Sequence, residues 1–395
     1  MKKSPLRALA AACIVAAGIC FVLGVYIVGL SDRNAAERDF ISYWAAGQQL
    51  VHGANPYDLQ TVRALELAAG RPSNEPLLTM RNPPVAFFLA WPLGLFSPKT
   101  GLILWLLVLL GGLSVSLWIL WLVNGRPDNR FHLCGYLFAP AIACLMAAQF
   151  GIFLLIGVAL FLYFHKTRPF LAGAALLLCA LKPHLFLPFG IVLILWAVRH
   201  KTYVILVGFA AALFASCALS FSLDPHAWSQ YSQMMRAGGA LDEAVPALSV
   251  SFRFLLDRHA VWLQFVPEAA ACMWGVWYFW TRRDRWNWMD HGLLLLLVGA
   301  LCTPFGWFTD ETMLLPAVLA GLYRAVDARR SFLPLAVFAG VALIEVLASV
   351  QITSPYYLWT TPAWLAWYLY ATGRIGASAK SMRRDASLPD QARSR

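Results

Sequence analysis

The sequence predicts an all-α polytopic membrane protein with about 12 transmembrane helices. Of its 395 residues, 60% are hydrophobic and 13% are charged, whereas an ordinary soluble domain is about half apolar and a quarter charged. The mean hydropathy is +0.63. Apolar runs of bilayer-crossing length, about 20 residues each, recur along almost the whole chain. Together these observations exclude an ordinary cytoplasmic enzyme.

The expected spans follow one another closely. The first, at residues 6–30, follows a basic start and is longer than the apolar part of a usual signal peptide, so we expect it to be retained. Further spans are expected at residues 99–123, 131–148, 151–164, 170–181, 183–198, 203–221, 260–280, 288–302, 312–326, 332–350 and 357–370. Residues 1–372 would then form one membrane domain, followed at 373–395 by a basic cytoplasmic tail that we expect to be disordered.

The apolar segment at residues 83–97 is not expected to cross the bilayer. It is short, opens with Pro83 and Pro84, and carries Pro92 inside, which favours an interfacial or re-entrant helix. With this choice, most Lys and Arg residues after it fall in connections on one side, which the positive-inside rule makes cytoplasmic. Both termini are then cytoplasmic, and two large periplasmic loops, residues 31–98 and 222–259, contain most of the acidic residues.

The net charge of +11 does not indicate a nucleic-acid partner. The basic residues form short clusters between apolar runs, which is a topology signal, and no nucleic-acid-binding motif is present. The eight cysteines lack CxxC spacing and histidine partners. Neither a disulfide framework nor a metal site is therefore expected.

The first periplasmic loop begins with the sequence RDFISYWAAGQQLVHGANPYD, residues 38–58. Read as a helix, it places Phe40, Trp44 and Gly47 on one face, which predicts an amphipathic helix lying on the membrane with Asp39 at its start. The residues alone leave two interpretations of Asp39. It is either an N-cap, worth about 1 kcal/mol, or a functional carboxylate held at the boundary between water and lipid.

The order of motifs resembles the polyprenol-phosphate-hexose-dependent glycosyltransferases of family 87, which have the GT-C fold. The resemblance starts with the pattern DFxxYWxAGxxLxxGxNPYD at Asp39 and continues with NPP at residues 82–84. It extends through AQF around Gln149, LKPH around Lys182 and TPFGWFTDETMLLP around Asp310. The family commonly has a glycine before the glutamine, where this chain has Ala148.

This resemblance implies an inverting hexosyltransferase that takes its sugar, with mannose favoured, from a polyprenyl-phosphate co-substrate. It implies action on a glycolipid or polysaccharide acceptor at the periplasmic face of the bacterial inner membrane, without a metal or other cofactor. It also implies that Asp39 is the general base. A lipid phosphate is a good leaving group, so such a site needs a base for the acceptor hydroxyl and cations for the phosphate.

Further candidate residues lie on the same expected side of the membrane. Those considered for the donor phosphate are Lys182, Arg253 and Arg258. Those considered for the sugar or the acceptor are Tyr43, Trp44, Asp58, Gln149, His184 and Asp310. Purely structural interpretations stay open for three of them. Lys182 would extend its ammonium toward the membrane surface, Asp58 would stabilise a turn or cap a helix, and Asp310 would be favoured by its place at a helix N-terminus.

Two other classes of function stay open. A lipid-linked-sugar flippase or another transporter would need ionisable groups near the middle of the membrane, where this chain offers essentially Glu345 alone. A membrane scaffold without a substrate would not need an acidic, aromatic first loop. The gathering of acids on one side favours chemistry at that face.

Overall fold

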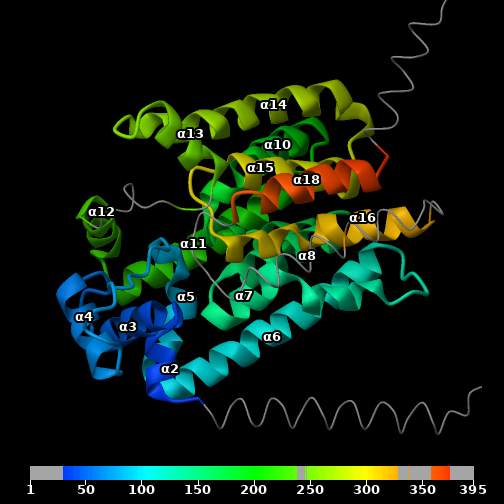
Figure 1. The fold of residues 1–395 in the computed structure, drawn as a ribbon. Helices are drawn as coiled ribbons and strands as arrows, with labels where there is room; N and C mark the ends of the chain where they lie inside the picture. Colours follow the sequence, from blue (N-terminus) through cyan, green and yellow to red (C-terminus); the bar gives the residue numbers. More distant parts are fainter. Residues whose placement is uncertain (1–29, 238–244, 246, 328–337, 339–356, 374–395) are drawn as a thin grey trace, which may run out of the picture.

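The computed structural model describes residues 30–237, 245, 247–327, 338 and 357–373, and these residues form helices and connections without any β-strand. The longer helices lie side by side in one bundle (Figure 1). Two of them, α6 (Pro98–Val123) and α11 (Tyr203–Leu223), are long and apolar enough to cross a membrane. The prediction of an all-α chain is confirmed for this part, and the apolar helices are consistent with a membrane protein. The number of spans stays a prediction.

The other helices that correspond to expected spans are shorter, and several of them are preceded by a 3₁₀ or π turn. They are α7 (Ala139–Ala147), α8 (Gly151–Phe164), α9 (Pro169–Ala175), α10 (Leu187–Arg199), α14 (Val266–Arg282), α15 (Leu293–Cys302), α16 (Leu315–Asp327) and α18 (Thr360–Ala371). Proline occupies the first turn of several of them, because its fixed φ suits that position and its missing N–H is not needed there. The expected spans at 6–30 and 332–350, Glu345 and the tail lie outside the described residues, apart from Phe338.

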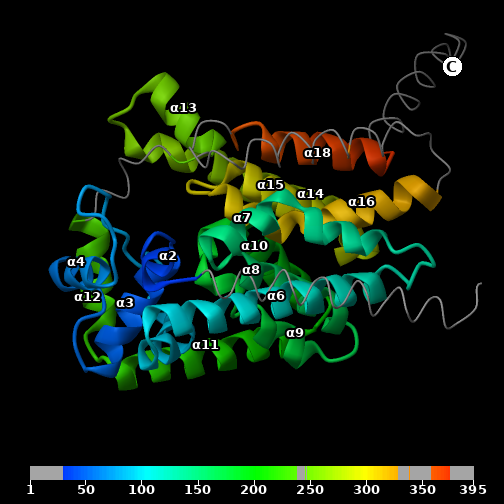
Figure 2. The same cartoon turned by 60° about the horizontal axis from the view of Figure 1, so that its bottom comes forward.

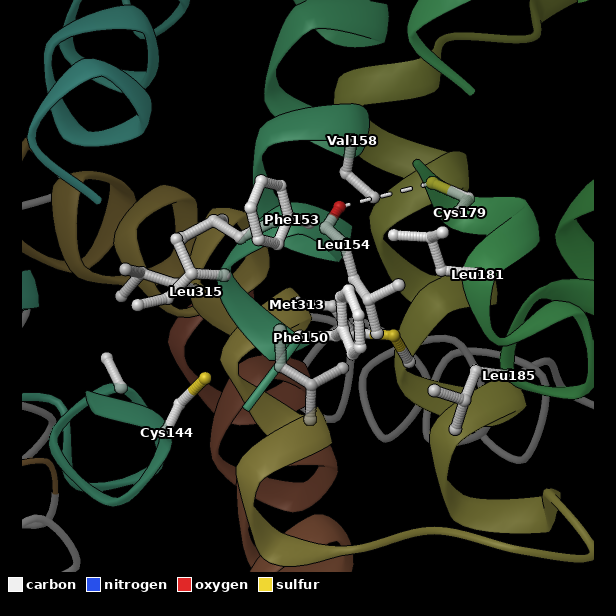
Figure 3. Close-up of a cluster of buried hydrophobic side chains, with 14 of the residues drawn as sticks. Cys144, Phe150, Phe153, Leu154, Val158, Cys179, Leu181, Leu185, Met313 and Leu315 are labelled. Carbon is white, nitrogen blue, oxygen red and sulfur yellow. Dashed lines mark hydrogen bonds between the residues drawn. The ribbon is translucent and has the colours of Figure 1, made fainter. Parts of the chain in front are cut away.

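Helix α8 forms the centre of the bundle. Most of its side chains are buried, which is expected of a helix that is apolar on every side and enclosed by other helices. Figure 3 shows Phe153, Leu154 and Val158 of α8 packed with Met313 and Leu315 and with Cys179. This core holds the start of α8 against the segment around residues 308–314.

The two expected periplasmic loops meet at one end of the bundle. They form α2 (Asp32–Ala36), α3 (Phe40–Val51), α4 (Leu59–Ala68), α12 (Ala227–Ala237) and α13 (Leu248–Leu256), which lie toward the left in both Figure 1 and Figure 2. Arg199 and Asp284, from the connections after α10 and α14, form an ion pair of 3.0 Å. Loops expected on one side of the membrane are thus neighbours in the fold.

The proline-containing segment expected not to span is a short, broken helix. It consists of a 3₁₀ turn (Pro84–Ala86), α5 (Phe87–Ala90) and a second 3₁₀ turn (Trp91–Leu95). It packs very closely on α3, since a Cβ added at Gly47 would lie 2.2 Å from the backbone oxygen of Ala90. The segment is thus short and interrupted, and its interfacial or re-entrant placement stays a prediction.

The prediction that the apolar face of α3 packs on the membrane rather than on protein is wrong. Ten of its twelve residues are buried within the protein, and the indole N–H of Trp44 donates to the carbonyl of Phe96 at 2.9 Å. The apolar residues of α3 contact α5, the turn after it and α6 rather than lipid. Helix α3 is therefore an internal helix of the described structure, with most of its surface in contact with other parts of the protein.

Candidate functional site

The Asp39 side chain is turned away from its own helix. Asp39 occupies the N-cap position of α3, yet its backbone is already helical and its carboxylate makes no cap hydrogen bond. Instead, Oδ2 accepts a hydrogen bond from Nε2 of Gln149. The neighbouring Arg38 donates to the carbonyl of Met146 at 2.5 Å and so fastens this stretch to the end of α7. The N-cap interpretation of Asp39 is therefore wrong.

Gln149 lies in the tight connection between α7 and α8. Ala148, which precedes it, has a φ of +55°, a left-handed conformation that ends α7 and turns the glutamine inward. Glycine adopts this conformation without steric cost, which gives a physical reason for the glycine that the family resemblance leads one to expect here. At the start of α8, a Cβ on Gly151 would lie 2.3 Å from the carbonyl oxygen of Thr309. This close approach allows the Thr309 hydroxyl to donate to Oε1 of Gln149 at 2.9 Å.

Lys182 brings a positive charge into the same cluster. Its ammonium lies 2.5 Å from Oδ1 of Asp310 and 3.4 Å from Oε1 of Gln149. The side chains of Lys182 and Asp310 are only 13% and 3% exposed. Buried charges are tolerated when they are paired and hydrogen-bonded, and this pair satisfies both conditions. Gln149 therefore links the carboxylate of Asp39 to the ion pair.

Residues of the first loop and of the segment before α16 hold the backbone around the ion pair in place. The Asn82 amide donates to the carbonyl of Leu181 at 3.0 Å, and the Tyr57 hydroxyl donates to the carbonyl of Asn82 at 3.1 Å. The other carboxylate oxygen of Asp310 accepts from the backbone N–H of Trp307 at 3.1 Å. The NPYD and NPP motifs therefore act as supports for the LKPH segment.

Burial raises the pKa of the Asp39 carboxyl above its ordinary value. The hydrogen bond from Gln149 and the charges of Lys182 and Arg71 act in the opposite direction, and Asp310 raises the pKa further. Arg71 is buried and donates to the carbonyl of Ala36 at 2.8 Å, just before Asp39 in the chain. A carboxyl group with a raised pKa is suited to accept a proton near neutral pH. The neighbouring buried cation is suited to stabilise an anion bound in the same place.

The candidates on the first loop have different surroundings. Tyr43 is buried between the rings of Trp105 and Phe150, and Trp44 is buried against the turn that follows α5. Asp58 caps α4 by accepting from the backbone N–H and hydroxyl of Thr61, which lowers the pKa of Asp58. Packing or capping involves all three side chains, and Tyr43 also lies within electrostatic reach of Asp39 and Asp310.

The remaining candidates lie toward the second loop. His184 follows Lys182 by two residues and contacts the ring of Phe305 edge-on. Arg253 is buried, and it donates to the carbonyl of Arg258 at 2.7 Å and to Gln264 at 3.0 Å. Arg258 is exposed, with its guanidinium over the ring of Phe254. The contacts of Arg253 hold the end of α13, and no contact described for either arginine reaches the Asp39 cluster.

The sequence pointed to the four central residues but missed several of their partners. Thr309 and Asn82 stand inside motifs that were noted for other residues, and their hydrogen bonds depend on tertiary structure. Arg71 has no distinguishing pattern around it. Glu311 directly follows Asp310 in the same motif; it is buried and accepts hydrogen bonds from Thr360 and Thr361.

Comparison with known proteins gives one match. No curated protein and no solved structure matches the chain. The model of glycosyltransferase family 87 matches residues 81–304, which is more than half of the sequence. The match includes Gln149 and Lys182, whereas Asp39 lies before it and Asp310 follows it. This chain belongs to glycosyltransferase family 87.

Proposed function

We propose that the protein transfers a hexose, with mannose favoured, from a polyprenyl-phosphate carrier to a glycolipid or glycan acceptor. The reaction would take place at the periplasmic face of the bacterial inner membrane, with inversion at the anomeric carbon and without a metal. The membership in family 87 supports a glycosyltransferase. The observation that carries the finer proposal is the inward Asp39 carboxylate, joined through Gln149 to the Lys182–Asp310 pair.

In this proposal Asp39 is the general base. It takes the proton of the acceptor hydroxyl while the hydroxyl oxygen bonds to the anomeric carbon of the donor sugar. The bond between that carbon and the phosphate oxygen breaks, and polyprenyl phosphate leaves with the electron pair. The raised pKa of the Asp39 carboxyl supports this role, because a base works best when its pKa approaches the working pH.

Lys182 would stabilise the departing phosphate. An ammonium group has three N–H donors, and the described contacts engage it with Asp310 and Gln149, which leaves one donor for a phosphate oxygen. Low exposure strengthens such a contact because bulk water does not screen it. Arg253 and Arg258 stay weaker candidates for the phosphate because their described contacts are with α13 and its neighbourhood.

The test is transfer of radiolabelled hexose from synthetic polyprenyl-phosphate donors to membrane lipid and glycan extracts. Purified wild-type protein is compared with Asp39→Asn and, as a matched control on the same loop, with Asp58→Asn. We expect Asp39→Asn to abolish transfer and Asp58→Asn to keep it, with both variants folded. An active Asp39→Asn variant would exclude Asp39 as the base.

The same experiment distinguishes the alternative of a non-enzymatic carrier. A flippase or transporter would bind or move the lipid-linked sugar without turning over any donor. Its ionisable groups would be expected along a path through the membrane, whereas the described cluster gathers residues 39, 149, 182 and 310 in one place. Binding without transfer, for every donor tried, would favour the carrier.

A further inference from the structure

Six basic side chains gather where helices α10 and α14 end. They are Arg199, His200, Lys201, Arg282, Arg283 and Arg285, and we call them the basic patch. The two helix ends are joined by an ion pair of 3.0 Å between Arg199 and Asp284. In addition, Nε2 of His200 lies 3.3 Å from the carbonyl oxygen of Arg283. The patch therefore depends on the tertiary fold, since the paired residues are 85 positions apart in the sequence.

The basic patch carries more charge than the neighbouring acids neutralise. Asp284 pairs with one of its arginines at 3.0 Å and lies 3.8 Å from another. The next acid along the chain, Asp290, pairs with an arginine of α16 instead. Lys201, Arg282 and Arg285 are exposed and form no ion pair with any residue that the structure describes. Three cations are thus left for an anionic partner.

An exposed apolar stripe on each of the two helices ends at the basic patch. The stripe on α14 consists of Met273, Val276, Trp277 and Trp280, which are 38–69% exposed. Their spacing of three, one and three residues places them on one face of the helix. On α10, Ile194 and Val198 are one turn apart and each is 52% exposed. The two helices pack against each other, so both stripes lead to the same charged surface.

Two arginines of the basic patch lie over aromatic rings. The guanidinium of Arg282 is 4.3 Å from the centre of the Tyr278 ring, and that of Arg283 is 4.8 Å from the centre of the Trp280 ring. A guanidinium that stacks on a ring keeps its N–H donors at the rim for a phosphate. Tryptophan and tyrosine beside basic residues are typical of the level at which lipid headgroups lie.

We propose that the basic patch binds the phosphate of an anionic phospholipid from the surrounding bilayer, with its acyl chains along the apolar stripes. Lys201, Arg282 and Arg285 would hold the phosphate. A phosphate held by both helix ends would also strengthen the contact between α10 and α14. The proposal does not depend on the proposed function, because the patch lies at the end of α14 opposite α13 (Figure 1).

The combination of charge and apolar surface favours a lipid over a soluble anion. A free anion would contact the charges and leave the apolar stripes exposed, whereas a phospholipid matches both. The connections after α10 and α14 are also expected on the cytoplasmic side, where anionic lipids attract Lys and Arg residues next to membrane helices. The occupant is therefore expected to come from the cytoplasmic leaflet.

Native mass spectrometry of the purified full-length protein measures the binding. The probes are dioleoyl phosphatidylglycerol, which is anionic, and dioleoyl phosphatidylethanolamine, which carries no net charge. We expect the wild-type protein to bind phosphatidylglycerol about tenfold more tightly than phosphatidylethanolamine, or better. The variant Lys201→Gln/Arg282→Gln/Arg285→Gln should bind phosphatidylglycerol about tenfold more weakly than wild type and lose the preference.

A matched control removes the same amount of charge elsewhere. Arg130→Gln/Lys166→Gln/Arg168→Gln changes three exposed residues on the same expected side of the membrane, and it should bind phosphatidylglycerol within about threefold of wild type. If the triple variant of the basic patch does not fold, single variants decide. Arg285 has no hydrogen bond or ion pair in the described structure, so Arg285→Gln should fold. It should bind about threefold more weakly than Arg130→Gln.

Three outcomes would overturn the proposal. Equal affinity of the wild-type protein for the two lipids would show that the site does not recognise headgroup charge. Equal losses in the patch variant and the control would assign the preference to the overall charge of the protein. Displacement of phosphatidylglycerol by an equal concentration of glycerol phosphate would show that the patch takes a free anion and not a lipid.

Discussion

Gln149 is predicted to set the working pH of the site. Gln149→Ala removes the hydrogen-bond donor to Asp39 and the acceptor for Thr309 and Lys182. A hydrogen bond to a charged group contributes about 1.5–3 kcal/mol, and 1.36 kcal/mol corresponds to a factor of ten in rate. We therefore expect kcat/KM to fall about 10- to 100-fold near neutral pH.

The pH profile carries the more specific part of this prediction. The Gln149 hydrogen bond lowers the pKa of Asp39 against the effect of burial, so its removal raises that pKa further. The acidic limb of kcat/KM should then move to higher pH, because the base must be unprotonated to act. The measurement is the pH dependence of hexose transfer by wild type, Gln149→Ala and Gln149→Asn, whose amide is one methylene too short to reach.

Thr309→Val is the matched control for Gln149→Ala. It removes only the hydroxyl that donates to Oε1 and leaves the bond between Gln149 and Asp39 in place. We expect a loss of less than about tenfold and little movement of the acidic limb. If Gln149→Ala keeps the wild-type profile and a kcat/KM within about twofold of wild type, the linking role of Gln149 is refuted.

Three further predictions concern the same cluster. Gly151→Ala should lower the free energy of unfolding by about 1–3 kcal/mol and reduce transfer, because the added Cβ meets the carbonyl of Thr309. The control Gly111→Ala, whose added Cβ has no atom within 4 Å, should have a neutral or stabilising effect on thermal melting in detergent. Lys182→Met should lower the free energy of unfolding, measured with denaturant, by about 3–5 kcal/mol, because it leaves Asp310 buried without a cation. The double variant Lys182→Met/Asp310→Asn should regain stability but not activity. A double variant that is less stable than Lys182→Met would contradict this prediction. Wild-type transfer should fall on acidification at a higher pH than an ordinary aspartate would give, because burial raises the pKa of Asp39; a profile flat down to the usual range of aspartate would count against it.

The helix boundaries were predictable where apolar runs end at strong sequence signals. The expected spans at 151–164 and 203–221 correspond to α8 and α11 almost residue for residue. The run at 170–181 was expected to be continuous, yet α9 ends at Ala175. Apolar composition predicts that a segment is buried. It does not predict where the helix is interrupted, because that depends on packing against segments that are distant in the sequence.

The site was predictable as a set of residues but not as an arrangement. Asp39, Gln149, Lys182 and Asp310 were all singled out, whereas Lys182 was assigned to phosphate and Asp310 to sugar without any expectation that they would pair. The orientation of α3 was wrong for a related reason. An apolar helix face packs equally well on lipid or on protein, and periodicity does not distinguish the two. Side chains that are far apart in sequence meet only through the tertiary fold.

The spacing of the cluster along the chain has a consequence for biosynthesis. Gln149 lies 110 residues after Asp39, and Asp310 lies 128 residues after Lys182. A ribosome delivers such a chain to the membrane from its N-terminus, so the aspartate arrives early and the counter-ion of the lysine arrives late. A chain that ends between residues 182 and 310 therefore holds Asp39, Gln149 and Lys182 but lacks Asp310, the counter-ion of Lys182. The cluster of Asp39, Gln149, Lys182 and Asp310 is therefore complete only after translation has passed residue 310.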